Sequence, residues 1–486
     1  MSSQPVNEPI LGYAPGSPER AALQAELDQQ MSEVVEIPCI INGQKVFTGN
    51  IQTQVIPHNH GHVIANVHIG GKAEIEAACK AAIDAQDAWI NIGLEARCAI
   101  FEKCAELLIG EWRMKVNAST MLNQSKTAFQ AEIDSACELI DFWNFNCYYA
   151  RQFHDMYQPL VSPSGVKNST EIRPLEGFVL AITPFNFSSI AANLPSAPAI
   201  LGNTAIWKPS RNSYHSNYVL MELMMEAGLP AGVINFVPSS GPDVSDVCLS
   251  NPDFAGVHFT GSTAVFQGLW QQIGEALPNL KSYPRIVGET GGKDFVVAHP
   301  DCDEQGLLVA LLRGSFEYQG QKCSAASRAY VPNSVWGRIA EPLCDEVRKI
   351  TMGDARDFTN FMTAVIDQRA FDKISGYIDR AKASDTCDVI VGGGHDDSVG
   401  WFIEPTIIVT TDPNYESMVE EIFGPVLTVF IYEDDGFEDV LKICDTASPY
   451  ALTGSIFATH DQDVQTAFNA LRFTAGNFYI NDKPTG

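Results

Sequence analysis

The sequence predicts an α/β protein with two doubly wound parallel sheets, each in a domain of its own. The first observation is an alternation of short apolar runs and amphipathic helical segments over residues 178–262. The second is a further α/β series, with apolar runs near residues 295, 331, 388, 402, 426 and 455. Such alternation is typical of parallel sheets covered by helices on both faces. We therefore expect one domain over residues 1–287 and a second over 288–486.

The segment before this alternation is predicted to be mostly helical. Residues 19–30 fit a short helix, and Asn42-Gly43 between apolar residues indicates a β-hairpin. Apolar residues at helical spacing predict three further helices, over 72–91, 95–123 and 127–149. The last of these carries an aromatic stripe that we interpret as core packing, formed by Phe142, Trp143, Phe145, Tyr148 and Tyr149.

Within the alternation we expect four strands, each followed by a helix. The predicted strands are 178–182, 204–207, 233–237 and 256–259. The predicted helices are 190–199, 214–227, 243–249 and one that begins after Gly261-Ser262. The uncharged stretch 177–207 has the length of a membrane span, but its three prolines and three asparagines would break a spanning helix. We interpret it as strand, loop, helix and strand.

The charge of the chain excludes some classes of partner. The formal net charge is -28 at pH 7, and so acidic a surface repels phosphate backbones and anionic lipid. We expect neither nucleic acid nor a membrane as partner. The twelve cysteines include no Cys-x-x-Cys pair, and the N-terminus has no secretory or transit pattern. These features favour a reducing compartment, either bacterial cytoplasm or a mitochondrial matrix after removal of a presequence.

The most informative motif surrounds Cys323. The run Phe-Glu-Tyr-Gln-Gly-Gln-Lys-Cys-Ser has no apolar period, so a buried structural cysteine is the weaker interpretation. A thiolate attacks an aldehyde carbon well when local dipoles or cations lower its pKa. Glu289 lies on a second Gly-rich segment and is either part of a surface turn or a general base. Because it accompanies the Cys323 motif, we favour a base that activates water to hydrolyse a thioester.

Polar residues follow the predicted strands. Asn186, after the first strand, either donates to an oxyanion or caps the next helix. Lys208 and Ser210 follow the second strand and are candidates for binding ribose hydroxyls. Gly261-Ser262 places a helix N-terminus where a diphosphate can bind. There is no Gly-x-Gly-x-x-Gly fingerprint, so an ordinary dinucleotide-binding motif is not predicted.

Two further segments have competing interpretations. Glu421, in Glu-Glu-Ile-Phe-Gly-Pro, offers a carboxylate to a ribose, or else belongs to a solvated acidic turn. The run His58-Asn59-His60-Gly61-His62 suggests a metal site, but no cysteine or acidic residue stands beside it. We interpret this run as a polar turn and expect no metal.

Taken together, these motifs resemble the aldehyde dehydrogenase superfamily. The similarity runs from Asn7 to the last residue. The Phe-Glu-Tyr of residues 316–318 is more specific than the superfamily motifs, and it resembles the members that oxidise L-glutamate 5-semialdehyde. The resemblance implies an aldehyde-dehydrogenase-like fold with an NAD-binding domain and a catalytic domain. It also implies a small oligomerisation hairpin near 158–176 and a homodimer.

The resemblance also assigns roles to residues. It implies that Cys323 is the nucleophile, Glu289 the water-activating base and Asn186 the oxyanion donor. The expected NAD ligands are Thr183, Lys208, Ser210, Gly261, Ser262, Val265, Glu421 and Phe423. The small-molecule substrate is expected to contact Ser324 and Gly486.

The expected reaction is the NAD-dependent oxidation of L-glutamate 5-semialdehyde, formed from pyrroline-5-carboxylate, to L-glutamate. It proceeds through a thiohemiacetal and a thioester on Cys323 and is the second step of proline breakdown. Two departures from the family stand out: Gln319 replaces a usual glycine, and relatives continue past Gly486 into an anchor loop and an oligomerisation strand. We therefore expect this chain to be C-terminally truncated relative to the family. The alternatives are a dehydrogenase for another semialdehyde and a non-catalytic NAD-binding fragment.

Overall fold

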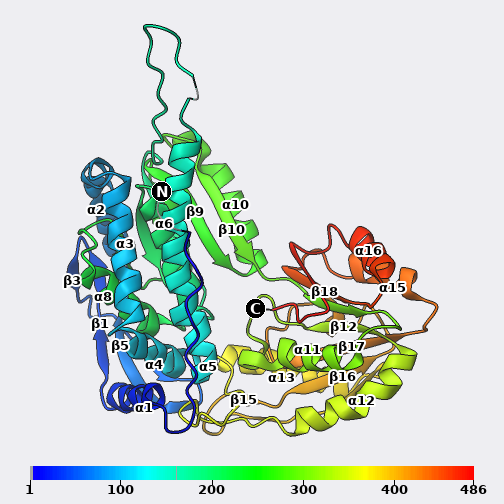
Figure 1. The fold of residues 1–486 in the computed structure, drawn as a ribbon. Coiled ribbons are helices and arrows are strands. Elements are labelled where there is room, and N and C mark those ends of the chain that lie inside the picture. Colours follow the sequence, from blue (N-terminus) through cyan, green and yellow to red (C-terminus); the bar gives the residue numbers. More distant parts are fainter. Residues whose placement is uncertain (1–3, 160, 486) are drawn as a thin grey trace. The chain divides into compact units, whose positions relative to one another are not determined.

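A computed structural model describes residues 4–159 and 161–485. The chain divides into two compact units (Figure 1). The first contains Met1–Val55, His62–Gln124 and Ala128–Glu289, and the second Ile56–Gly61, Ser125–Thr127 and Thr290–Gly486. Each unit holds a seven-stranded, largely parallel sheet, as the sequence predicts. Among the described residues, no helix is both long and apolar enough to cross a membrane.

The sheet of the first unit has the order β10-β9-β6-β7-β8-β2-β3. Its strands are β2 (Cys39–Ile41), β3 (Gln44–Val46), β6 (Phe178–Ile182), β7 (Thr204–Lys208), β8 (Ile234–Phe236), β9 (Phe254–Gly261) and β10 (Arg285–Thr290). Strands β9, β6, β7 and β8 are parallel, so their carboxyl ends meet at one edge. The predicted hairpin joins β2 to β3, with Asn42 and Gly43 at φ 51° and 71°.

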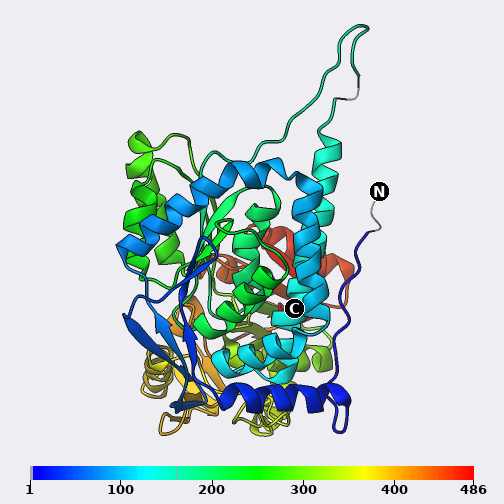
Figure 2. The same cartoon turned by 90° about the vertical axis from the view of Figure 1, so that its left-hand side faces the viewer.

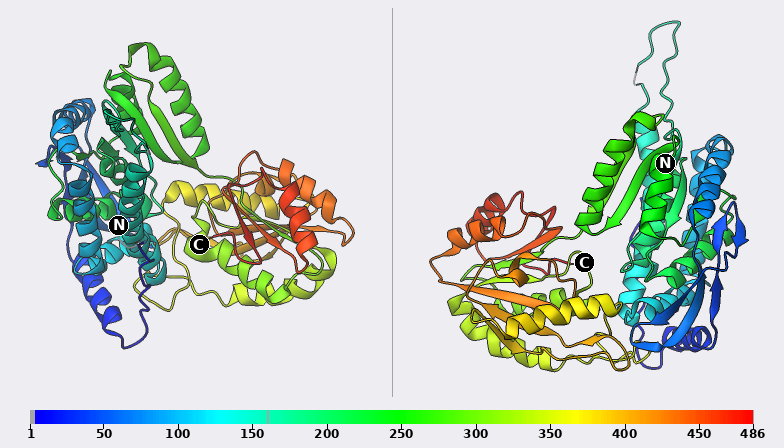
Figure 3. Two further views of the ribbon diagram at one scale, coloured as in Figure 1. Left: turned by 45° about the horizontal axis from the view of Figure 1, so that its top comes forward. Right: turned by 180° about the vertical axis from the view of Figure 1, so that it is seen from behind.

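Helices cover both faces of this sheet because its strands are buried on both sides. On β7, Trp207 packs into one core, whereas Ile206 packs into the core on the opposite face. The first core includes α3 (Leu94–Ile109), α6 (Glu138–Met156), α7 (Ser188–Ile200) and α8 (Tyr214–Glu226). The second includes α2 (Lys72–Asn91), α9 (Gly241–Ser250) and α10 (Thr263–Ala276), and Figure 3 shows α10 beside β9 and β10.

Two predicted helices are divided in the structure. The segment 95–123 forms α3 and α4 (Arg113–Gln124), with a break at Gly110. The segment 127–149 forms α5 (Ala128–Ala131), a π-helix η1 (Glu132–Cys137) and most of α6. The aromatic stripe is only partly core: Trp143 is buried, but Tyr149 is 48% exposed, so that prediction was wrong for Tyr149.

The remaining elements of the first part of the chain are short. They are α1 (Pro18–Met31), β1 (Val35–Ile37), β4 (Ile51–Ile56), β5 (Asn59–His68) and η2 (Leu277–Asn279). Strands β1, β5 and β4 form a three-stranded sheet. After α6 the chain leaves the helices as a long, narrow excursion and returns to β6 (Figure 2). The described residues of this excursion form no strand, but the Gln158 side chain donates to Thr170 O at 3.1 Å.

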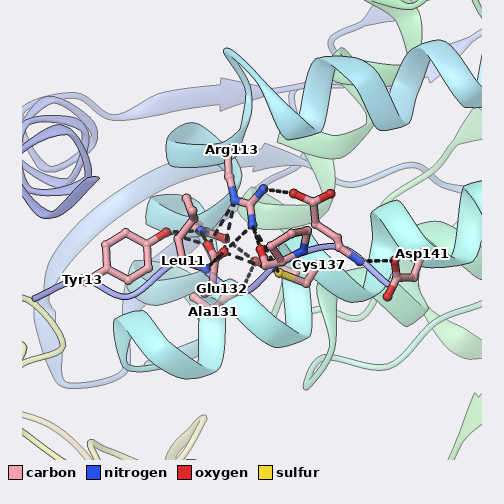
Figure 4. A network of polar contacts seen from close by, with 11 residues as sticks. Leu11, Tyr13, Arg113, Ala131, Glu132, Cys137 and Asp141 are labelled. Carbon is pink, nitrogen blue, oxygen red and sulfur yellow. Dashed lines mark hydrogen bonds and ion pairs between the residues drawn. The ribbon is translucent and has the colours of Figure 1, made fainter. Parts of the chain in front are cut away.

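A buried ion pair fixes the N-terminal segment to η1 (Figure 4). Arg113 Nη2 donates to Glu132 Oε1 at 2.5 Å, and Arg113 Nη1 donates to Glu8 at 2.6 Å. The Tyr13 hydroxyl donates to the second oxygen of Glu132 at 2.6 Å. Glu132 is fully buried, so these donors replace the water that its carboxylate lost on folding.

The sheet of the second unit has the order β13-β16-β17-β12-β11-β18-β19. Its strands are β11 (Phe295–Ala298), β12 (Arg328–Pro332), β13 (Cys387–Val391), β16 (Thr406–Thr410), β17 (Val426–Tyr432), β18 (Thr453–Phe457) and β19 (Asn477–Ile480). Only β13 pairs antiparallel, with β16. The predicted run from 402 is divided by Pro405 into β15 (Phe402–Ile403), which pairs with β14 (His395–Asp396), and β16.

Helices also cover both faces of this second sheet. Along β11, Val296 packs into a core with α11 (Glu304–Phe316) and α12 (Asn333–Arg348). The next residue, Val297, packs into the opposite core with α15 (Phe437–Thr446) and α16 (Asp461–Ala470). Figure 1 shows these two helix pairs on opposite sides of the sheet. The remaining helices are α13 (Gln368–Lys382) and α14 (Glu416–Val419).

Candidate active site

The predicted cofactor residues of the first unit gather at the carboxyl edge of its sheet. In the strand register, Ile182 of β6 pairs with Lys208 on one side and with Phe259 of β9 on the other. Thr183 therefore follows β6 directly beside Lys208, and its N–H donates to Lys208 O at 3.2 Å. The Thr183 hydroxyl accepts from the Trp207 indole at 3.0 Å. This edge is where doubly wound sheets bind ligands.

The Lys208 side chain places a positive charge at this edge. Burial, with the nearby charge of Arg211, lowers the pKa of Lys208 to about 8. The ammonium form therefore still predominates at neutral pH and can donate to hydroxyl or phosphate oxygens. Ser210 lies in the turn before α8, where its Oγ accepts from Asn212 N at 3.4 Å.

The N-terminus of α10 lies at the end of the adjacent strand β9. Ser262 is its N-cap residue and makes no side-chain capping bond. The first N–H groups of a 14-residue helix carry partial positive charge, which favours a bound phosphate. Val265, in the first turn, is 53% exposed and offers an apolar surface beside that site.

Glu289 lies on a strand that the sequence did not predict. It is an exposed residue of β10, the edge strand, rather than part of a turn. Gly288 explains how β10 packs, because a Cβ there would lie 2.2 Å from the ring of Phe266 on α10. With glycine before the carboxylate, the Phe266 ring lies directly against the β10 backbone.

Asn186 lies in the loop between β6 and α7 and is 4% exposed. The N-cap residue of α7 is Phe187, so the interpretation of Asn186 as the helix cap was wrong. A buried side-chain amide is held in one orientation by its hydrogen bonds. The oxyanion role of Asn186 stays a prediction.

In the second unit, Cys323 lies in the segment that joins α11 to β12. Of the twelve cysteines, Cys323 and Cys387 are the two that are not buried. The side chains of Gln321 and Lys322 before Cys323 are buried, so the half-buried thiol stands on a well-packed segment. This combination of partial exposure and a fixed backbone suits a nucleophile better than a core thiol.

A left-handed turn, η3 (Glu317–Gly320), precedes the cysteine. Tyr318, Gln319 and Gly320 have φ values of 50°, 56° and 64°. For residues other than glycine this conformation costs on the order of 1–2 kcal/mol each. Gly320 has a second reason to be glycine, since a Cβ there would lie 2.2 Å from Gly424 O. Backbone strain of this kind is concentrated at functional sites.

Glu421 and Phe423 lie in the loop before β17, which contacts this turn through Gly424. The Glu421 carboxylate lies against Gly291, where a Cβ would approach it to 2.1 Å, and it accepts from the Gly292 N–H. Burial raises the pKa of Glu421, while Lys373 and the Gly292 N–H oppose that rise. The side chain is half-buried, so the interpretation as a solvated acidic turn was wrong.

Sequence reasoning missed a buried pair of charged residues after Gly292. Burial lowers the pKa of Lys293 to about 7 and raises that of Asp294 to about 7. Asp294 accepts from Thr453 Oγ1 at 2.6 Å, whereas Lys293 Nζ has no hydrogen-bond partner among the described residues. A Lys-Asp pair directly before the apolar run of β11 was the available signal. Perturbed buried pairs such as this one are concentrated at functional sites.

The predicted substrate and metal residues have simpler surroundings. Ser324 Oγ lies 2.8 Å from Thr485 Oγ1, and Gly486 is outside the described residues. The three histidines of the His58–His62 run have separate partners: His58 contacts Ser125 and Asp354, His60 contacts Asp397 O, and His62 contacts Met31 O. The three side chains do not converge on one point.

The chain is similar to known proteins in both sequence and structure. A sequence model described as "Aldehyde dehydrogenase family" matches residues 47–486. The chain is 48% identical over 484 residues to the mitochondrial delta-1-pyrroline-5-carboxylate dehydrogenase of Dictyostelium discoideum. The aligned region covers 99% of this chain and 87% of the relative.

Solved structures similar to this chain are also named as pyrroline-5-carboxylate dehydrogenases. The delta-pyrroline-5-carboxylate dehydrogenase of Mycobacterium tuberculosis, solved with NAD, has a TM-score of 0.95 and 48% identity, over 99% of this chain and 89% of that one. The 1-pyrroline-5-carboxylate dehydrogenase from Thermus, also solved with NAD, has a TM-score of 0.92 and 28% identity, over 100% of this chain and 92% of that one.

Proposed function

This chain belongs to the aldehyde dehydrogenase family, and from that premise we propose that it oxidises L-glutamate 5-semialdehyde to L-glutamate with NAD. The semialdehyde is the open form of pyrroline-5-carboxylate. The observation that carries the proposal is the match over 99% of the chain to dehydrogenases named for that substrate. The half-buried Cys323 on its strained turn supports the same chemistry.

The residues present fit NAD. Lys208 and Ser210 are suited to the adenosine ribose, and Gly261, Ser262 and Val265 at the start of α10 are suited to the diphosphate. The remaining proposed ligands are Thr183, Glu421 and Phe423, of which Glu421 offers its carboxylate to the nicotinamide ribose. When bound, NAD supplies the acceptor for the hydride that leaves the substrate.

The side chains of this protein then carry the remaining steps. The Cys323 thiolate attacks the aldehyde carbon, and Asn186 with the Cys323 N–H donates to the oxygen that becomes negative. After oxidation a thioester remains on Cys323. Glu289 takes a proton from water, which attacks the thioester and releases glutamate and the free thiolate. Ser324 holds the substrate carboxylate, and Gly486 is proposed to assist it.

The test is NADH formation from pyrroline-5-carboxylate and NAD by this 486-residue chain. Turnover is expected in the wild type and absent in Cys323→Ala. Cys387→Ala is the matched control, because Cys387 is the other thiol that is not buried. Wild-type rates in Cys323→Ala would overturn the assignment of the nucleophile, and turnover of other semialdehydes in preference would overturn the assignment of the substrate.

The role of Glu289 has a kinetic signature of its own. If Glu289 activates only the hydrolytic water, Glu289→Gln should form one NADH per site in a rapid burst and then turn over slowly. A uniformly slow reaction without a burst would instead place Glu289 in the oxidation step.

Assembly and location are proposals of the same kind. We propose a homodimer that uses the excursion near 158–176, because Val161, Val166 and Ile172 there are 77%, 54% and 49% exposed. Replacing all three by serine should shift the mass measured by light scattering from dimer to monomer. The twelve free thiols support a reducing compartment, either the cytosol or a mitochondrial matrix.

A further inference from the structure

The turn before Cys323 is held by the side-chain amide of Gln319, which is 1% exposed. Its Nε2 lies 3.0 Å from Ser125 O, 3.0 Å from Thr363 Oγ1 and 2.8 Å from Ala364 O. Its Oε1 accepts from the Thr363 N–H at 3.0 Å. Both polar atoms of this side chain are therefore satisfied inside the second unit, by two segments far from it in the sequence.

These partners are themselves fixed by buried contacts. Thr363 Oγ1 donates to the same carbonyl, Ser125 O. Ser125 Oγ lies 2.8 Å from His58 Nδ1, and His58 Nε2 lies 3.3 Å from Asp354 Oδ1. Ser125 and His58 are 0% and 3% exposed. His58 thus supports the 125–127 loop, a role that the sequence did not suggest.

The neighbours of Gln319 are fastened to the same two segments. Lys126 Nζ lies 4.3 Å from the centre of the Tyr318 ring, and both residues are buried. Gln321 Oε1 accepts from the Ile366 N–H at 2.9 Å. Three of the five residues before Cys323 are therefore attached to either the 125–127 loop or the segment 363–366.

We propose that Gln319 is a positioning residue for Cys323. Two successive side-chain-bearing residues in the left-handed region return to a favoured conformation unless contacts hold them. The hydrogen bonds of the Gln319 amide keep these two residues in the left-handed region. The turn in that conformation fixes the orientation of the Cys323 thiol. Gln319 itself contacts no reacting atom. The inference rests on the proposed function, in which Cys323 is the nucleophile.

Gln319→Ala removes the amide and keeps the strain of the turn. Because small displacements of reacting groups cost up to about 100-fold in rate, we expect kcat to fall by about 10- to 100-fold with KM for NAD unchanged. Gln319→Gly is the second variant, since glycine adopts positive φ freely and should fold even if Gln319→Ala does not. It lacks the amide but also removes the strain that the amide opposes, so with the glycine that is usual in the family its kcat should stay near that of the wild type.

Asn235→Ala is the matched control, in the first unit. The Asn235 amide is fully buried, accepts from Asn42 N at 2.9 Å and donates to Gly232 O at 2.8 Å, beside another left-handed turn. Its removal should lower the melting temperature without lowering kcat. Thr363→Val should lower kcat as Gln319→Ala does, and Thr363→Ser, which keeps the hydroxyl, should retain it.

Wild-type kcat in Gln319→Ala would overturn the proposal, as would an equal loss of kcat in Gln319→Gly or in Asn235→Ala. If Gln319→Ala does not fold, Thr363→Val decides in its place. If the wild type does not oxidise pyrroline-5-carboxylate, the proposed function fails and the position of Cys323 is tested without substrate. The rate at which iodoacetamide alkylates Cys323 should then change in Gln319→Ala and Thr363→Val and not in Asn235→Ala. An unchanged alkylation rate would overturn the positioning role.

Discussion

The carbonyl oxygen of Gly424 occupies the space that a side chain on Gly320 would need. A Cβ on Gly320 would lie 2.2 Å from that oxygen, and Gly320 also has φ 64°. The turn that precedes Cys323 and the loop that carries Glu421 can therefore touch only because residue 320 has no side chain.

Gly320→Ala should consequently disturb both loops. Overpacking and the unfavourable φ together should lower the free energy of unfolding by roughly 2–4 kcal/mol, measured by urea denaturation. Gly337→Ala is the control, since Gly337 lies in α12 with nothing within 4 Å of an added Cβ. That variant should be neutral or more stable by about 0.5–1 kcal/mol. Equal effects of the two changes would show that the contact with Gly424 does not matter.

Glu132→Gln should destabilise the first unit strongly. It removes one of the two carboxylates paired with the buried Arg113, and breaking comparable buried pairs costs about 3–5 kcal/mol. Urea unfolding followed by fluorescence measures the change. Asp439→Asn removes an ion pair with Lys442 in which both side chains are more than 70% exposed, and it should change the midpoint little. A small effect of Glu132→Gln would mean that Glu8 alone balances the charge of Arg113.

His215 should make the stability of the first unit depend on pH. Burial, with a contribution from Lys115, lowers the pKa of His215 from its ordinary value of 6.5 to about 4. The folded state therefore binds the proton more weakly than the unfolded state. The stabilisation is fully present above pH 6.5 and is lost as the pH falls towards 4, by roughly 3 kcal/mol in total.

The measurement is the free energy of unfolding of the wild type and of His215→Gln between those pH values. The glutamine variant cannot take up the proton, so its stability should fall less steeply with acid. Parallel curves for the two proteins would contradict the assignment of this titration to His215.

Lys208→Met should weaken NAD binding while leaving the fold intact. Loss of a charged hydrogen bond costs about 1.5–3 kcal/mol, so KM for NAD should rise by roughly 10- to 100-fold. In the wild type, affinity for NAD should also fall as the pH rises through about 8, because the ammonium charge is lost there. The control is Lys103→Met on the exposed face of α3. Unchanged KM in Lys208→Met would remove Lys208 from the cofactor site.

The parallel strands were predictable because burial on both faces leaves a continuous apolar run. Strand β6 was predicted with its observed bounds for this reason. The edge strands β10 and β19 were missed, since each has one neighbour and mostly exposed or half-buried side chains. The break at Gly110 was missed because the apolar spacing continues through it.

Candidate site residues, too, could be predicted only where their signal is local in the sequence. Cys323 and Glu289 stood out as candidates because glycine and polar neighbours are local signals, and their roles stay predictions. The contacts of Gln319 are not local: its partners Ser125 and Thr363 lie 194 and 44 residues away. Only the fold brings these segments together.

That separation has a consequence for the order of events during synthesis. Ser125 leaves the ribosome 194 residues before Gln319, and Thr363 follows 44 residues after it. Contacts between such distant residues form late, because closing long loops costs entropy before the contacts repay it. The turn before Cys323 is therefore completed only when most of the chain has emerged, and under the proposed role of Gln319 a nascent chain carries the cysteine before its thiol is positioned.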